Sequence, residues 1–186
     1  MNEICHNYIE KTGITAGVWD RLVKPGYLSA PASKGHHLAS EGGLVTHSVN
    51  VTKRLLDLTE KLGVRWPRPE SPYIVGMYHD LVKCVCYAKD GDGYKYVQPP
   101  YPGHGACSVA IATELGIKLV AAEIIAITYH MGMFGVGREY TDKEFNAALD
   151  RYAPLVISTH TADWWAARCD EEFDGTKPDG SKGSQS

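Results

Sequence analysis

The stretch SPYIVGMYHDLVKCV, residues 71–85, decides the fold because its apolar side chains cover most faces of a predicted helix. We expect this helix to run from about Pro72 to Cys84. A helix that is hydrophobic on most of its surface is normally buried inside a protein. The stretch therefore predicts a central helix around which the other elements pack.

Further helices are predicted on both sides of this central one. The strongest runs from Gly42 to Leu62, where apolar residues recur at steps of three and four, and Gly63 is a suitable C-cap. The segment 86–98 carries Asp90-Gly91-Asp92-Gly93 between aromatic and β-branched residues, which predicts a short hairpin. The other predicted helices cover residues 13–23, 105–115, 119–131, 141–149 and 153–169. We therefore predict an all-α helical bundle with one small β-hairpin.

The length of 186 residues fits one domain, which we expect to span residues 1–170. Residues 171–186 are expected to form a disordered tail, because the final stretch DGTKPDGSKGSQS is polar and lacks large apolar side chains. The chain has five cysteines, an odd number at irregular spacing. This pattern predicts reduced, structural cysteines rather than a disulfide framework.

Charge and hydropathy exclude several classes of function. The formal net charge is -3, so the chain lacks the basic footprint expected of a protein that wraps duplex nucleic acid. No apolar run approaches the ~20 residues that span a bilayer. The N-terminal sequence MNEICHNYIEK has no basic region followed by an apolar stretch, so it does not resemble a secretory signal. These features predict a cytoplasmic protein without a membrane partner.

The adjacent pair His79-Asp80 is the first candidate for chemistry, since it falls late in the most apolar predicted helix. A lone buried histidine is usually a structural residue, but an ionised aspartate there is costly unless it is paired or bound to metal. Imidazole and carboxylate are common ligands of Zn, Mn, Fe and Co. Lys83 is expected on the same helical face, either to hold a substrate phosphate or to extend to solvent.

Two other predicted helices carry similar residue types. His47 lies near the start of the long amphipathic helix, and Asp163 lies in the last helix between small residues and two tryptophans. An unpaired carboxylate is unfavourable in such closely packed surroundings. With His79-Asp80 they could bind one metal ion. His160 shares a face with Asp163 and either orients that carboxylate or packs in the core.

The ordered set His47, His79-Asp80 and Asp163 on predicted helices resembles the HD-domain superfamily of metal-dependent phosphohydrolases, over roughly residues 40–170. The segment HDLVK also resembles the HDxxK of the cyclic-dinucleotide phosphodiesterases. The GYP signature of that subgroup is absent from this chain, so the resemblance does not carry its substrate.

Two more histidines extend the resemblance to members that bind two metals. His104 in PGHGACS and His130 in ITYHMG complete an H…HD…H…H…D pattern like that of the cyclic-nucleotide phosphodiesterases. By this resemblance two divalent transition metal ions, drawn from Mn, Fe, Co, Ni or Zn, are bridged by Asp80. The remaining ligands would then be His47, His79 and Asp163 for one ion and His104 and His130 for the other.

The segment APASKGHHLASEGGLVTHS, residues 30–48, is similar to the entry into HD domains attached to some bacterial 3′–5′ exoribonucleases and relaxases. In this view His36 and His37 lie over the metals and contact substrate, whereas the alternative is a solvated loop. Arg138 and Arg168 either assist in binding a phosphate or are ordinary exposed arginines.

The resemblance and the residues together predict a metal-dependent phosphohydrolase that uses a metal-activated water. The expected partner is a small phosphorylated substrate, a nucleotide or a short phosphodiester. Asp80 is expected to accept the proton of the water, and Lys83 to offset charge on the phosphoryl oxygens. Two alternatives stay open: an HD-fold di-iron oxygenase acting on a small organic substrate, and a non-catalytic nucleotide-binding module.

Overall fold

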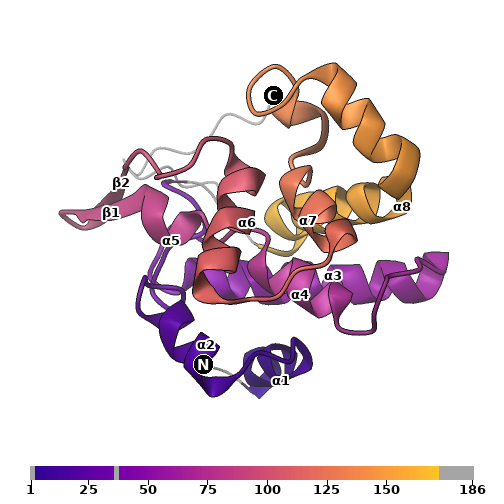
Figure 1. Ribbon diagram of the computed structural model, residues 1–186. Helices are drawn as coiled ribbons and strands as arrows, with labels where there is room; N and C mark the ends of the chain where they lie inside the picture. Colours follow the sequence, from indigo (N-terminus) through magenta and orange to yellow (C-terminus); the bar gives the residue numbers. More distant parts are fainter. Residues whose placement is uncertain (1–2, 36–37, 172–186) are drawn as a thin grey trace.

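The computed structural model describes residues 3–35 and 38–171. Within these ranges the protein is mostly helical and has one antiparallel hairpin, which confirms the predicted fold class (Figure 1). The α-helices are α1 (Glu3–Lys11), α2 (Ala16–Val23), α3 (Gly43–Leu62), α4 (Ser71–Tyr78), α5 (Lys83–Cys86), α6 (His104–Leu115), α7 (Ala121–Thr128) and α8 (Asp142–Trp165). The remaining elements are the strands β1 (Tyr87–Asp90) and β2 (Gly93–Tyr96), the 3-10 helix η1 (Gly132–Gly135) and the π-helix η2 (Ala166–Asp170).

Helices α3 and α4 pack along one another at the centre of the protein (Figure 1). Every residue of α4 except Tyr73 is buried, as expected for its nearly continuous apolar sequence. Gly76 allows the close approach of the two helices, because a Cβ there would lie 2.3 Å from the Thr52 hydroxyl and 2.7 Å from Thr52 Cα. The smallest residue of α4 therefore sets the distance between the two central helices.

The central helix is shorter than predicted. It ends at Tyr78 instead of Cys84, and residues 79–82 form turns before α5 begins. The amide of Lys83 donates to the carbonyl of Asp80, three residues back, at 2.9 Å. This tighter hydrogen-bonding pattern places His79 and Asp80 just beyond the last turn of α4, where the backbone leaves the helix.

The two helices predicted for residues 141–149 and 153–169 correspond to the two halves of α8. They meet at a kink at Tyr152, whose φ of -133° and ψ of 22° are not helical. Pro154 follows the kink and has no N–H to continue the helical hydrogen bonds. At the start of α8, Thr141 and Glu144 form a capping box that satisfies amides of the first turn.

The N-terminal helix α1 was not predicted from the sequence. Cys5 and Ile9 are its buried residues, and they pack into the cluster that contains the apolar side chains of α4. With nine residues and two buried positions, α1 offers only a short pattern from which a helix could be predicted. The next helix, α2, was predicted and begins after the N-cap Thr15, whose hydroxyl accepts from the amide of Val18.

The predicted hairpin is present and projects from one side of the helices (Figure 1). Tyr87 pairs with Tyr96 at its open end, and Asp90 pairs with Gly93 beside the turn. Gly91 has φ 59°, a left-handed conformation that glycine adopts without strain. None of the described cysteines forms a disulfide, in agreement with the sequence prediction. No helix in the described ranges is long and apolar enough to cross a membrane.

Candidate metal centre

The chain brings together all six residues that the resemblance proposes as metal ligands. They come from five separate segments: α3, the turn after α4, the start of α6, the turn after α7 and the second half of α8. Their potential ligand atoms form two groups. Within each group, all of these atoms lie within 4.8 Å of one another. The groups are His47, His79, Asp80 and Asp163, and Asp80, His104 and His130. Asp80 belongs to both.

The two carboxylate oxygens of Asp80 face different histidines. Oδ1 lies 2.5 Å from His104 Nε2 and 3.6 Å from His130 Nε2. Oδ2 lies 3.4 Å from His79 Nε2 and 3.5 Å from His47 Nε2. This carboxylate is only 2% exposed and lies between the two groups, so it could bridge two ions held by them.

His79 and His130 present the same nitrogen to the cluster in the same way. Each ring donates its Nδ1–H to the carbonyl three residues back, Gly76 at 3.0 Å and Ile127 at 2.7 Å. In the neutral ring, this bond leaves Nε2 as the nitrogen with a lone pair. Both Nε2 atoms are buried and have no hydrogen-bond partner among the described residues. A buried polar atom without a partner is unfavourable, and a metal ion is one group that would satisfy it.

His47 is oriented by a carboxylate outside the predicted ligand set. Its Nδ1 lies 2.8 Å from Glu171 Oε1, and its Nε2 lies 3.0 Å from Asp163 Oδ1. Asn50 also donates to Glu171 at 3.2 Å. A carboxylate behind a histidine in this manner fixes the ring and raises its basicity toward a metal. Glu171 therefore has the geometry of an orienting residue.

Glu171 was not among the predicted site residues, because it was expected to be the first residue of a disordered tail. It is instead only 5% exposed. A single acidic residue in a polar stretch gives no pattern that distinguishes it from its neighbours. The other residues of the expected tail, 172–186, lie outside the described residues, as do His36 and His37, so the expectations for them stay predictions.

Close backbone contact positions the histidines of the second group. A Cβ at Gly105 would lie 2.4 Å from the carbonyl oxygens of Ile127 and Thr128. This glycine therefore lets the start of α6 rest directly on the end of α7. The contact places the His104 and His130 rings 5.4 Å apart, centroid to centroid.

Glu139 supports the same end of α6. Its carboxylate accepts from the amide of His104 at 2.9 Å and from the amide of Gly105 at 3.4 Å. Amides of the first helical turn have no partner within the helix, so an acidic side chain there is stabilising. The neighbouring Arg138 was predicted to contact substrate, but it is exposed and does not line the cavity described below. Its predicted role has no support in this geometry.

The cluster without metal is a network of opposite charges. Burial alone raises the pKa of Asp80, but Lys83, His79 and His104 outweigh it and hold this pKa well below its usual value. Burial lowers the pKa of His79, yet Asp80 and Asp163 outweigh this effect and raise it to about 10. The carboxylates of the cluster therefore favour positive charge beside them, which a bound cation would also supply.

Lys83 reaches the cluster although it does not lie on a continuous helix with His79 and Asp80. Its Nζ is 2.6 Å from Asp80 Oδ2, and the residue is buried. Burial lowers the pKa of this amine, but the carboxylates of Asp80 and Asp163 more than compensate and raise it. Lys83 is therefore a fixed positive charge beside the shared carboxylate.

A cavity of about 540 Å³ opens onto one side of the cluster. Four of the predicted ligands contribute to its wall, together with Lys83 and Arg168. Its lining consists of Ser33, Asp80, Lys83, His104, His130, Met131, Asp163, Trp164, Ala167 and Arg168. A ligand in this cavity would contact both of the groups that share Asp80.

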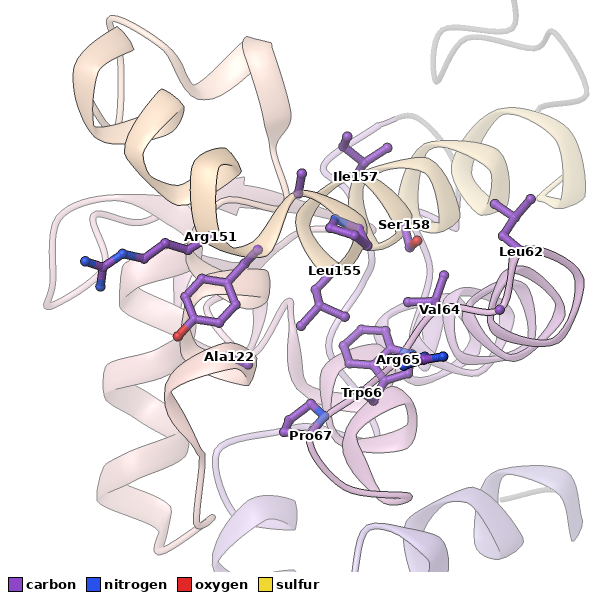
Figure 2. A pocket seen from close by; sticks show the side chains of 14 residues that line it. Leu62, Val64, Arg65, Trp66, Pro67, Ala122, Arg151, Leu155, Ile157 and Ser158 are labelled. Atoms are coloured by element: carbon purple, nitrogen blue, oxygen red, sulfur yellow. The ribbon is translucent and has the colours of Figure 1, made fainter.

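A second cavity of about 730 Å³ lies elsewhere, between the segment after α3 and the kink of α8 (Figure 2). Trp66, Leu155 and Pro67 are among the side chains around it (Figure 2). Its wall contains no histidine, cysteine or carboxylate among the described residues. Although it is larger, its described lining offers no histidine, cysteine or carboxylate to bind a metal, so the smaller cavity is the candidate site.

His160 does not orient Asp163, one of the two roles considered from the sequence. Its ring nitrogen Nδ1 lies 2.8 Å from the carbonyl oxygen of His130 and donates to it. The contact ties the middle of α8 to the turn that carries a candidate ligand. His160 therefore fixes the backbone of the second group.

Comparisons with known proteins give no family or relative for this chain. No protein-family model matches it, and neither a curated protein nor a solved structure shows a significant similarity. The buried histidine and aspartate cluster is therefore the feature of this protein that indicates a function.

Proposed function

We propose that this protein is a metal-dependent phosphohydrolase with two divalent transition metal ions, of the kind found in the HD-domain superfamily. The observation that carries the proposal is that the buried Nε2 atoms of His79 and His130 have no hydrogen-bond partner among the described residues, although both face the shared Asp80 carboxylate, at 3.4 and 3.6 Å. Leaving a buried polar atom unpaired costs about 1–3 kcal/mol. Bound metal would remove this cost at both positions.

The donor set fits such ions well. His47, His79 and Asp163 would hold one ion, and His104 and His130 the other, with Asp80 shared between them. Ions bound there would lower the pKa of a water molecule and polarise a phosphoryl oxygen. Neutral imidazole and carboxylate ligands suit Mn, Fe, Co, Ni and Zn.

The protein's own residues would handle charge and protons around the reacting phosphate. Lys83 supplies a buried positive charge beside Asp80, which offsets negative charge on phosphoryl oxygens. Asp80, as the shared carboxylate, would accept a proton from the attacking water. Arg168 adds a second positive charge on the cavity wall. These groups favour an anionic, phosphorylated substrate.

The size of the cavity supports a small substrate. Its volume of about 540 Å³ falls within the ~300–1,000 Å³ range of small-molecule sites. The net charge of -3 gives no support to binding along a nucleic acid duplex. A nucleotide or a short phosphodiester is therefore the proposed substrate, as the sequence resemblance also implies.

Metal analysis of purified variants tests the first half of the proposal. Wild-type protein should carry two ions per chain. Asp80→Ala should bind neither ion at full occupancy, and His104→Ala should keep only the ion held by the first group. His6→Ala is the matched control, because His6 is exposed and its ion pair is formed with Glu10, one turn further along α1. Metal content that is unchanged in both Asp80→Ala and His79→Ala would refute the metal assignment.

An activity screen tests the second half. Phosphomonoesters and phosphodiesters should be offered with Mn, Co, Ni, Mg and Fe added separately, and hydrolysis should disappear in Asp80→Ala. The same donor set also suits a pair of iron ions. Oxygen consumption without phosphate release would therefore favour the oxygenase alternative. Nucleotide binding without any turnover would favour the non-catalytic module.

A further inference from the structure

An aromatic cluster lies beside the metal centre and has no role in the function proposed so far. Trp164 lines the cavity of the candidate site and also the neighbouring pocket on the outer side of α8. Its side chain is 47% exposed, although it follows the candidate ligand Asp163 directly. A half-exposed indole on the wall of a charged cavity offers an apolar surface to whatever enters it.

The indole is held in place by two other rings. His160 stacks on it with centroids 5.7 Å apart and an interplanar angle of 28°. Phe134 meets it edge-on at 5.2 Å. Because both neighbours limit its rotation, Trp164 is a preorganised surface rather than a freely moving side chain.

His160, which stacks on Trp164, is connected to the metal centre through a backbone carbonyl. His160 donates to the carbonyl of His130, and Gly132 packs so closely that a Cβ there would lie 2.8 Å from the His160 ring. Gly132 also has φ 58°, which favours glycine. The position of Trp164 is therefore fixed relative to the His130 ligand and to the charged wall formed by Lys83.

We propose that a planar base of the substrate stacks on Trp164 while its phosphate lies at the metals. This inference rests on the proposed function. The wall of the cavity then offers two chemically distinct surfaces. Lys83 and the metals bind the anion, and the indole binds a flat ring. This arrangement selects nucleotides over sugar phosphates, because every base has an aromatic face and a sugar has none.

The next residue, Trp165, provides a matched control. It is the same residue type with a similar exposure of 51%, and it lines the outer pocket but not the cavity of the metal centre. Its ring contacts the guanidinium of Arg54, which lies 5.8 Å from the ring centroid, and not the metal centre. Loss of Trp165 should therefore leave nucleotide binding unchanged.

Equilibrium binding to the metal-loaded full chain tests the platform without depending on turnover. The probes are the phosphonate analogue of adenosine 5′-monophosphate, in which CH₂ replaces the ester oxygen, and the matching ribose phosphonate. Trp164→Ala should weaken binding of the adenosine probe by about 5-fold to 150-fold, the range of base–aromatic stacking. Binding of the ribose probe should change by less than about 2-fold, and Trp164→Phe should restore most of the loss for the adenosine probe.

Three results separate the platform from the proposed function. Equal affinity of wild-type protein for the two probes would overturn the platform and leave the metal site standing. Equal losses in Trp164→Ala and Trp165→Ala, or for both probes, would also overturn it. Failure of both probes to bind a protein that carries its metals would overturn the platform together with the phosphohydrolase proposal. Metal content of each variant, measured in parallel, shows whether the cluster is intact.

Discussion

Glu123 is a fully buried carboxylate that joins the starts of α4 and α7, the two helices that precede His79 and His130. Arg68 donates to it twice, through Nε and Nη2, each at 2.8 Å. The hydroxyl of Ser71 donates at 2.8 Å and the amide of Val120 at 2.9 Å. The pair therefore connects segments that lie 55 residues apart in the sequence.

Replacing Arg68 with methionine should leave Glu123 buried with half of its hydrogen bonds. Breaking a buried ion pair from one side costs about 3–5 kcal/mol. Arg68 is 32% exposed, and Ser71 and Val120 keep their bonds, so water and these two donors compensate part of the loss. We expect the free energy of unfolding to fall by ~2–3 kcal/mol.

Urea denaturation of the metal-free protein measures this change. Arg65→Met is the matched control, since Arg65 is exposed and forms no ion pair within the described residues. It should alter the free energy of unfolding by less than about 0.5 kcal/mol. Arg68→Met should also lower the free energy of unfolding by at least ~1 kcal/mol less in a Glu123→Gln background, where a neutral amide replaces the carboxylate.

Two outcomes would refute this reasoning. A change in Arg68→Met no larger than that of Arg65→Met would mean that the pair contributes nothing measurable. Strict additivity of Arg68→Met and Glu123→Gln would mean that the two side chains do not interact energetically, despite their distance of 2.8 Å.

Three further changes test the metal centre. Glu171→Gln should weaken metal binding by ~10-fold to 100-fold in a chelator competition, because the orienting carboxylate behind His47 is lost; an unchanged affinity would contradict that role. The pKa of His79 is raised to about 10 in the folded, metal-free protein, so its stabilisation is complete below about pH 6.5 and is lost as pH rises through about 10. Unfolding in EDTA across this range should show the loss, and His79→Asn should remove that part of the pH dependence. Gly105→Ala should destabilise the protein by at least ~1–3 kcal/mol, since its Cβ would meet two backbone carbonyls at 2.4 Å; a thermal midpoint equal to wild type would disprove the close packing.

The residues of the cluster could be found from the sequence because their chemistry is unusual in an apolar context. An aspartate beside a histidine after Ile74, Val75 and Met77 has few explanations other than pairing or ligation. The order of the remaining histidines then followed from a known pattern. Their meeting in one cluster depends on the packing of five segments, and the structure supplies that information.

The residues that could not be predicted act through contacts that are distant in the sequence. Glu171 and His47 are 124 positions apart, and neither the spacing nor the local composition connects them. The early end of α4 was missed for a different reason. Helical periodicity continues through residues 79–82, but the chain there changes to hydrogen bonds that span three residues, which hydropathy does not reveal.

Because five segments contribute to one centre, bound metal would also affect how the protein unfolds. A pair of ions held by α3, α6, α8 and the turns after α4 and α7 would close several long loops at once, much as a set of cross-links does. Global unfolding would then have to wait for metal release, so the dissociation rate of the ions would limit how long the folded chain survives. A chelator that removes the ions would then shorten the lifetime of the folded protein more than a moderate rise in temperature.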